Sequence, residues 1–220
     1  MKIKKILICL FILSLSSCNQ QKVFLYLGEN FFFQNVDFFS SLEEFYSHEI
    51  NHDFSSNKFY MKDFYNQLEQ DAMNLITSDK ISDLLKKTEK IIFNIGNYEV
   101  LRLIDYNKYS FNYDQEVIKT SLEMFDYYFH QSLDILTDFT KDITIIPLYN
   151  SLMLNDEDKE NYSGIIKDYN KIIYDNCNEF NVKYISIEKM SYFIYQDNHL
   201  SESGYQYLLK MIKKSYESNQ

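Results

Sequence analysis

The sequence predicts an α/β fold, a three-layer α/β/α sandwich in which helices cover both faces of a parallel sheet. Short apolar runs rich in isoleucine and valine recur along the chain, and longer segments with apolar residues three or four positions apart separate them. Buried strands separated by helices are typical of a parallel sheet covered on both sides. The chain has 220 residues, of which 45% are hydrophobic, which is enough for a single core.

The predicted strands are short apolar runs. The first two are each closed by a glycine, Gly28 and Gly96. The four runs are residues 23–27, 90–95, 143–148 and 183–187. In a parallel sheet the chemistry sits at the carboxyl ends of the strands, so the residues that follow these runs are the candidates for a functional site.

The predicted helices share a spacing of three and four between apolar residues, and the last is clearly amphipathic. They cover residues 36–48, 61–75, 81–89, 113–139, 160–180 and 202–216. There is no internal repeat, no Gly/Ser-rich linker after the first residues, and no shift in composition. We therefore expect one domain over residues 23–217.

The first 17 residues are typical of a secretory signal. A basic start at Lys2, Lys4 and Lys5 precedes an apolar run over residues 6–15, which is too short to span a bilayer as a helix because spanning takes about 20 residues. The segment Leu-Ser-Ser-Cys ending at Cys18 resembles the bacterial lipobox. This resemblance implies cleavage before Cys18, acylation of that cysteine, and a short tether over residues 18–22. An ordinary signal peptide with an incidental cysteine is the alternative.

This interpretation places the protein outside the cytoplasm, held to the lipid bilayer of the cell membrane by acylated Cys18. Loss of the three lysines in residues 1–17 moves the formal net charge from -10 to -13. Nucleic acid is excluded as a partner, because such an acidic chain lacks a surface that neutralises phosphates. Cys177 would be the single cysteine left besides Cys18, so no disulfide within the chain is expected, and Cys177 is expected to be a buried structural thiol.

Three blocks at the expected strand ends carry the candidate site residues. They are Gly28-Glu29-Asn30, Gly96-Asn97-Tyr98-Glu99, and the stretch from Asp197 through His199 and Leu200 to Gly204-Tyr205. Their order and spacing resemble the SGNH/GDSL hydrolase family, in which such blocks supply a serine nucleophile, an oxyanion donor and a histidine base. The resemblance covers nearly the whole chain after Cys18, and it implies the flavodoxin-like SGNH type of three-layer fold.

Several of the residues that this family uses are replaced. The nucleophile position falls on Asn30, which has no hydroxyl, and the oxyanion asparagine falls on Tyr98, with Asn97 one position early. Only His199 stands where the family places it, because the orienting aspartate is shifted to Asp197. Gly28, Gly96 and Asn97 are candidates for oxyanion or ligand binding. Loss of both nucleophile and oxyanion donor predicts little remaining ester hydrolysis.

We therefore expect an SGNH-like domain with esterase activity lost or much reduced and its cleft used for binding. An envelope glycan or an acyl ester is the expected ligand class, and no cofactor is expected. The alternative is an active ester or acyl hydrolase that uses His199, while His199 as a structural residue that caps the last helix also stays open. The oligomeric state is not predicted by the sequence.

A competing motif suggests zinc. His48-Glu49-Ile50-Asn51-His52 fits His-Glu-x-x-His, which on a helix presents two imidazoles and a carboxylate to a metal ion. This pattern gives a remote second alternative, a zinc metallopeptidase using His48, Glu49 and His52. The sequence offers no third ligand at a recognised spacing, so our expectation is that there is no metal site, and that these histidines lie near a helix end.

Overall fold

The protein is described here by a computed structural model. It describes residues 23–29, 36–46, 50–51, 55–56, 60–73, 81–101, 103–105, 110–111, 114–149, 156–187 and 200–217. Cys18, Asn30, His48, Glu49, His52, Asp197 and His199 lie outside these residues. In the described part of the chain, no helix has both the length and the apolar character needed to cross a bilayer.

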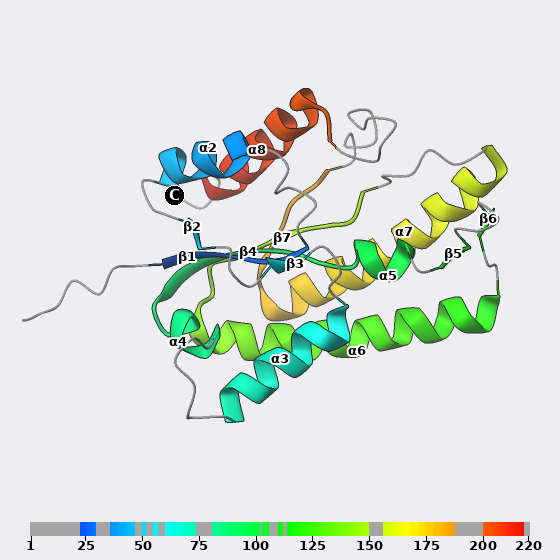
Figure 1. The fold of residues 1–220 in the computed structure, drawn as a ribbon, viewed down its shortest axis with the longest axis horizontal. Coiled ribbons are helices and arrows are strands. Elements are labelled where there is room, and N and C mark those ends of the chain that lie inside the picture. The colour runs from blue at the N-terminus through cyan, green and yellow to red at the C-terminus, as the bar shows by residue number, and fades with distance from the viewer. Residues whose placement is uncertain are drawn as a thin grey trace, which may run out of the picture.

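A parallel sheet forms the middle of the molecule (Figure 1). Its strands are β1 (Val23–Glu29), β2 (Ile50–Asn51), β3 (Ser55–Ser56), β4 (Thr88–Asn94), β7 (Ile143–Ile146) and β8 (Lys183–Tyr184). Their order is β2-β1-β4-β7-β8, and β3 also pairs with β1. A separate antiparallel pair consists of β5 (Ile104–Asp105) and β6 (Ser110–Phe111). The predicted fold class is confirmed: a parallel sheet lies between two layers of helices.

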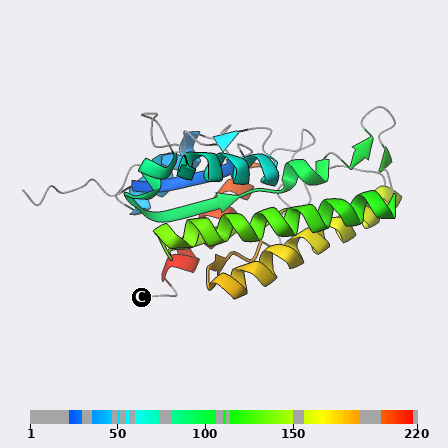
Figure 2. The same cartoon turned by 90° about the horizontal axis from the view of Figure 1, so that it is seen from below.

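The helices divide between the two faces of the sheet (Figures 1 and 2). One face is covered by α2 (Val36–Tyr46) and α8 (Glu202–Glu217), which pack against each other. The other is covered by α3 (Met61–Met73), α4 (Ile81–Leu85), α6 (Gln115–Phe139) and α7 (Asp156–Phe180). A short helix, α5 (Asn97–Leu101), follows β4 directly.

Alternation along the strands produces two separate cores. In β1, Leu25 and Leu27 face the core under α3, α6 and α7, whereas Phe24 and Tyr26 face the core under α2 and α8. Successive side chains of a strand point to opposite faces, so a strand with helices on both sides is apolar at most positions. This is why the central strands are continuous apolar runs rather than alternating ones.

Several boundaries differ from the sequence predictions. Strand β1 continues through Gly28 to Glu29, and β7 ends at Ile146, before Pro147, which has no N–H to donate to a neighbouring strand. The helix predicted for residues 81–89 ends at Leu85, because β4 already begins at Thr88. The short elements α5, β2, β3, β5 and β6 were not predicted.

The helical form of the zinc motif is not present. Helix α2 ends at Tyr46, and the centre of the motif, Ile50–Asn51, is strand β2, parallel to β1. The N–H of Ile50 donates to a Glu43 carboxylate oxygen at 3.1 Å. Two histidines share a face at a separation of four only when the chain between them is helical, and the two residues at the centre of this motif lie in a strand. The predicted helix over residues 36–48 ends two residues earlier, at Tyr46. The described residues contain no group of three or more His, Cys, Asp or Glu side chains that could hold a metal ion.

A charged cluster lies at the amino-end side of the sheet. Lys90 on β4 is only 1% exposed, and its Nζ lies 2.8 Å from a carboxylate oxygen of Asp142. Lys183 on β8 donates to the other oxygen of the same carboxylate at 2.8 Å. The Tyr216 ring of α8 lies 4.8 Å from Lys90 Nζ, close enough for a cation–π interaction. The cluster therefore joins three strand regions to the end of the last helix.

Candidate functional site

The carboxyl ends of β1, β3, β4 and β7 meet at one edge of the sheet (Figure 1). The register pairs Gly28 with both Ser55 and Asn94, and Asn94 with Ile146. These strands therefore end side by side. The sequence blocks that begin at Gly28 and Gly96 both start at this edge, as expected for a parallel sheet.

Gly28 occupies a place that no other residue fits. Its φ is +108°, and a Cβ atom there would stand 1.8 Å from the carbonyl oxygen of Asn94. Both the backbone conformation and the close approach of β4 require glycine. Glycine at this position therefore lets the end of β1 pack directly against β4.

Asn94 holds the ends of β4 and β7 together. It is fully buried, and its amide donates to the carbonyl oxygen of Ile146 at 2.9 Å. Its side-chain oxygen accepts from the amide of Asn97 at 3.4 Å. Asn94 was not among the predicted site residues, although a polar residue at the end of an apolar run and two positions before a glycine was a usable signal.

The second block turns sharply into α5. Gly96 has a φ of +112°, and a Cβ there would lie 3.0 Å from the Phe125 ring. The next three side chains then take different directions. Asn97 is 4% exposed and contacts Asn94, the Tyr98 ring lies 4.6 Å from the Tyr60 ring, and Glu99 accepts from the backbone N–H of Met61 at the start of α3.

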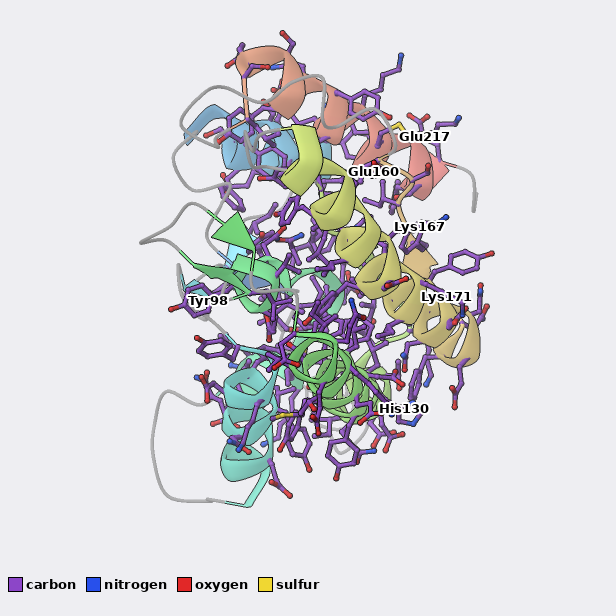
Figure 3. The ribbon with its side chains drawn as sticks, turned by 90° about the vertical axis from the view of Figure 1, so that its right-hand side faces the viewer. Tyr98, His130, Glu160, Lys167, Lys171 and Glu217 are labelled. Carbon is purple, nitrogen blue, oxygen red and sulfur yellow. The ribbon has the colours of Figure 1, made fainter. Side chains whose placement is uncertain are left out.

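These contacts decide what the block can donate. The Asn97 amide is turned inward toward the sheet and already donates to Asn94. Tyr98 is a half-buried residue of α5 (Figure 3), and its ring packs against the ring of Tyr60. The side chain at position 98, where the sequence resemblance led us to expect the oxyanion donor, is therefore a phenol that packs against another ring.

The third block leads into α8. Leu200 is buried, and the Ser201 hydroxyl accepts from the N–H of Gly204 at 3.1 Å. Tyr205 is buried and lies against Phe38 of α2. The Ser201 side chain therefore caps the N-terminus of α8.

Two other reactive side chains lie away from this edge. Cys177 is 1% exposed, and burial raises the pKa of its thiol to about 12, so it stays protonated at neutral pH. His130 on α6 (Figure 3) lies 3.1 Å from the side-chain oxygen of Asn176 on α7. Cys177 is thus the buried structural thiol that the sequence predicted.

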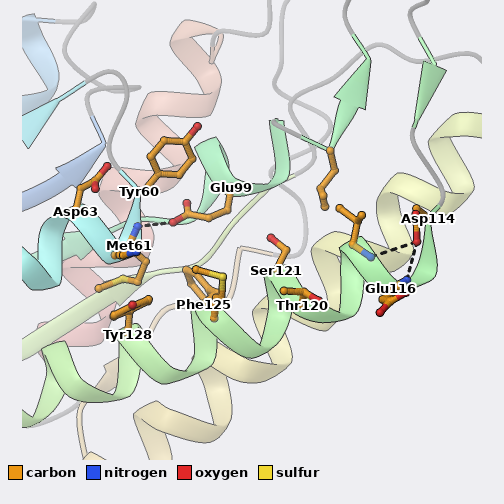
Figure 4. A pocket seen from close by; sticks show the side chains of 14 residues that line it. Tyr60, Met61, Asp63, Glu99, Asp114, Glu116, Thr120, Ser121, Phe125 and Tyr128 are labelled. Atoms are coloured by element: carbon orange, nitrogen blue, oxygen red, sulfur yellow. Dashed lines mark hydrogen bonds between the residues drawn. The ribbon is translucent and has the colours of Figure 1, made fainter.

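A pocket of about 710 Å³ opens beside this edge, between α3, α5 and α6 (Figure 4). Glu99 and Tyr60 line it, so the second block forms part of its wall. This pocket was not predicted from the sequence, because the residues that line it belong to segments that are far apart in the chain.

Comparison with known proteins finds the same fold in solved structures. No family model matches the chain, and no curated protein matches it. A lipase from a goat rumen metagenome matches with a TM-score of 0.63 at 15% identity, over 88% of this chain and 97% of that one. An acetylxylan esterase from Geobacillus stearothermophilus matches with a TM-score of 0.61 at 12% identity, over 88% and 93%. A lipase/acylhydrolase from Enterococcus faecalis matches with a TM-score of 0.59 at 12% identity, over 90% and 96%.

These likenesses define the class of fold. The chain has an SGNH hydrolase-like fold, as its three blocks led us to expect. Among the matching structures of the acetylxylan esterase are catalytic mutants in which a serine, an aspartate or a histidine is replaced by alanine. At identities this low the likeness concerns the fold, and the chemistry must be argued from the residues present here.

Proposed function

We propose that this protein is a lipid-anchored extracytoplasmic protein whose SGNH hydrolase-like domain has lost most or all of its ester hydrolysis and binds a ligand at the carboxyl edge of the sheet. The observation that carries this proposal is the residue after β1. Gly28 lets the end of β1 pack directly against β4, and the residue that follows Glu29 is Asn30. A carboxamide cannot attack a carbonyl carbon as a serine alkoxide does.

The replacement of the oxyanion donor also supports a loss of ester hydrolysis. Acyl transfer also needs donors for the developing oxyanion, and each such donor contributes about a hundred- to a thousand-fold in rate. Tyr98 packs on Tyr60, and Asn97 is turned toward Asn94. With both nucleophile and oxyanion donor replaced, His199 and Asp197 would have no hydroxyl to activate.

An envelope glycan or an acyl ester is the ligand class we propose for this cleft. The structural neighbours include a lipase and an acetylxylan esterase, which act on esters of lipids and of acetylated xylan. A cleft that keeps its shape but loses its nucleophile can still recognise such a molecule.

The test is hydrolysis of p-nitrophenyl acetate by the full-length protein in a non-ionic detergent, with His199→Ala as the matched variant. We expect both proteins to give the rate of buffer alone. Turnover that disappears in His199→Ala would contradict the proposal and establish the alternative, an ester hydrolase that uses His199 with an unusual partner.

Binding is measured separately with an acetylated xylo-oligosaccharide, by saturation-transfer NMR. We expect His199→Ala to leave this binding within about twofold, since a ligand held by the cleft as a whole does not depend on one base. No binding of this probe or of a short acyl ester would contradict the proposed ligand class.

A further inference from the structure

The pocket between α3, α5 and α6 has the size of a small-molecule site. Its volume of about 710 Å³ lies within the range of about 300 to 1,000 Å³ that is usual for ligand pockets. Its lining does not include Gly28, Asn97 or Tyr98. The pocket is therefore a neighbour of the carboxyl-edge site with its own set of side chains.

One wall of the pocket is apolar and partly exposed. Phe125 forms its base, and this ring is fixed by packing against Gly96 and against Phe129 at a centroid distance of 5.5 Å. Val117 and Met124 of α6 also line the pocket, although each is 45% exposed. Val117 lies about two turns before Phe125, and Met124 is its neighbour in the chain. Large apolar side chains exposed together in a concave place indicate that an apolar group covers them when the site is filled.

Two tyrosines reach the pocket from different elements (Figure 4). Tyr60 comes from the start of α3 and is held by the Tyr98 ring at 4.6 Å, and Tyr128 comes from α6 and is held by the Tyr65 ring at 5.5 Å. Their positions are therefore fixed before any ligand arrives. The faces of such rings attract cations, most strongly where water is partly excluded.

The charge of the lining is strongly negative. Four carboxylates line the pocket, and the single cationic side chain among the lining residues is Lys62. The carboxylates belong to Asp63, Glu99, Asp114 and Glu116. Glu99 is the most buried of them, at 8% exposed. A pocket with this balance concentrates cations and repels anions.

The helix N-termini at the pocket do not reverse this preference. The N-terminus of α3 is already satisfied by Glu99, which accepts from the N–H of Met61. The N-terminus of α6 is satisfied by Asp114, which accepts from the N–H groups of Glu116 at 2.9 Å and Val117 at 3.3 Å. An anionic ligand would have to displace one of these carboxylates.

We propose that this pocket binds an organic cation, a small molecule that carries an ammonium group on an apolar body. The apolar body covers Val117, Met124 and Phe125, while the ammonium group lies among the carboxylates and the tyrosine rings. This site does not rest on the function proposed above, because it uses neither Asn30 nor His199. It holds whether or not the protein hydrolyses esters.

The experiment is calorimetric titration of the full-length protein in a non-ionic detergent with benzyltrimethylammonium, and in parallel with benzyl alcohol and benzoate. The three probes share a ring and differ in charge. We expect the cation to bind about tenfold or more tightly than the neutral probe, benzoate not to bind, and the affinity for the cation to fall as salt is raised.

The variants test the location. Val117→Lys places an ammonium group at the pocket on an exposed helical position, and we expect it to weaken binding of the cation about tenfold or more. Tyr127→Lys is the matched control, since Tyr127 is exposed on the same helix and does not line this pocket. Circular dichroism of both variants checks that the helix content is kept.

Equal affinity for all three probes, no binding of the cation at millimolar concentration, or equal loss in Val117→Lys and Tyr127→Lys would overturn the proposal. Binding of xylobiose in this pocket, lost in Val117→Lys and without binding of the cation, would also overturn it and identify a neutral sugar as the ligand. Each of these outcomes can occur with or without ester hydrolysis, so failure here is distinguishable from failure of the proposed function.

Discussion

At Gly28 the backbones of β1 and β4 approach so closely that any side chain would strike the carbonyl of Asn94. We expect Gly28→Ala to lower the free energy of unfolding by about 3 kcal/mol or more, because the new Cβ meets backbone that cannot turn aside and φ stays positive. Urea denaturation measures the loss. An unchanged midpoint would mean that the two strands are further apart than described.

Gly164→Ala is the matched control for Gly28→Ala. It lies inside α7, and a Cβ there would meet nothing within 4 Å. Gly164→Ala should therefore raise stability by about 0.5 to 1 kcal/mol, since alanine favours the helix and restricts the unfolded chain. If Gly28→Ala lowers the free energy of unfolding and Gly164→Ala raises it, the effect of replacing glycine by alanine depends on the position of the glycine in the fold. A loss of stability in both variants would contradict this prediction.

Asp142 makes stability depend on acid. Burial acts to raise the pKa of this carboxyl, but hydrogen bonds and charges from Lys183 and Lys90 outweigh it and lower the pKa below its ordinary 3.8. A carboxyl with a lowered folded pKa contributes stability that is complete above about pH 4 and is lost as the pH falls through the folded pKa. We therefore expect the melting temperature of the protein to fall as the pH is lowered below about 4.

Asp142→Asn should remove this part of the acid sensitivity and be less stable at pH 7 by about 2 to 3 kcal/mol, because it leaves the Lys90 ammonium buried without its anion. Thermal melts between pH 7 and pH 3 make the comparison, with Asp138→Asn on the exposed end of α6 as control. Identical acid sensitivity in the wild type and Asp142→Asn would contradict the role of this carboxyl.

Among the secondary-structure elements, α6 depends most visibly on one cap. Asp114 accepts from the N–H groups of Glu116 and Val117 at the start of this 25-residue helix. Asp114→Ala should reduce stability by about 1 kcal/mol, whereas Asp138→Ala, at the helix end where a negative charge is unfavourable, should be neutral or slightly stabilising. Urea midpoints of the two variants check this, and equal shifts would contradict the capping role.

Elements that lie in long apolar or periodic segments were largely predictable from the sequence. The four runs that were predicted as strands overlap β1, β4, β7 and β8, and the long helices lie close to their predicted positions. The two-residue strands β2 and β3 were missed because no apolar run surrounds them in the sequence, and they are recognised as strands only by their pairing with β1.

Some of the site residues could be predicted from the sequence, and others could not. Gly28 and Gly96 could be recognised because glycine itself signals a special backbone position, and both have positive φ. Asn94 and Glu99 could not be assigned their roles, since their partners, Ile146 and Met61, lie on other elements. The pocket beside α6 could not be predicted from the sequence either, because aromatic and acidic side chains on an exposed helix are also typical of an ordinary solvated helix face.

For the whole molecule, the proposed membrane anchor rests on Cys18. We expect the full-length protein made in a bacterial host to sediment with membranes, and Cys18→Ser to leave them for the soluble fraction, because a lipidated cysteine would supply the membrane affinity. Mass spectrometry of the N-terminal peptide identifies the lipid. Cys9→Ser, within the proposed signal, should behave as wild type, and an unmodified N-terminal peptide from the wild type would contradict the proposal.

The parallel pairing of the main sheet also sets an order of assembly. β4 pairs with both β1 and β7, and it begins only at Thr88. Among the described residues before Thr88, β1 is the single strand longer than two residues. A growing chain therefore cannot close the centre of its sheet until more than a third of it has been made, and such long-range pairing is intrinsically slow. Until this closure the early chain lacks the centre of its folded sheet, and an unfolded polypeptide, unlike a folded domain, can be threaded through a narrow channel.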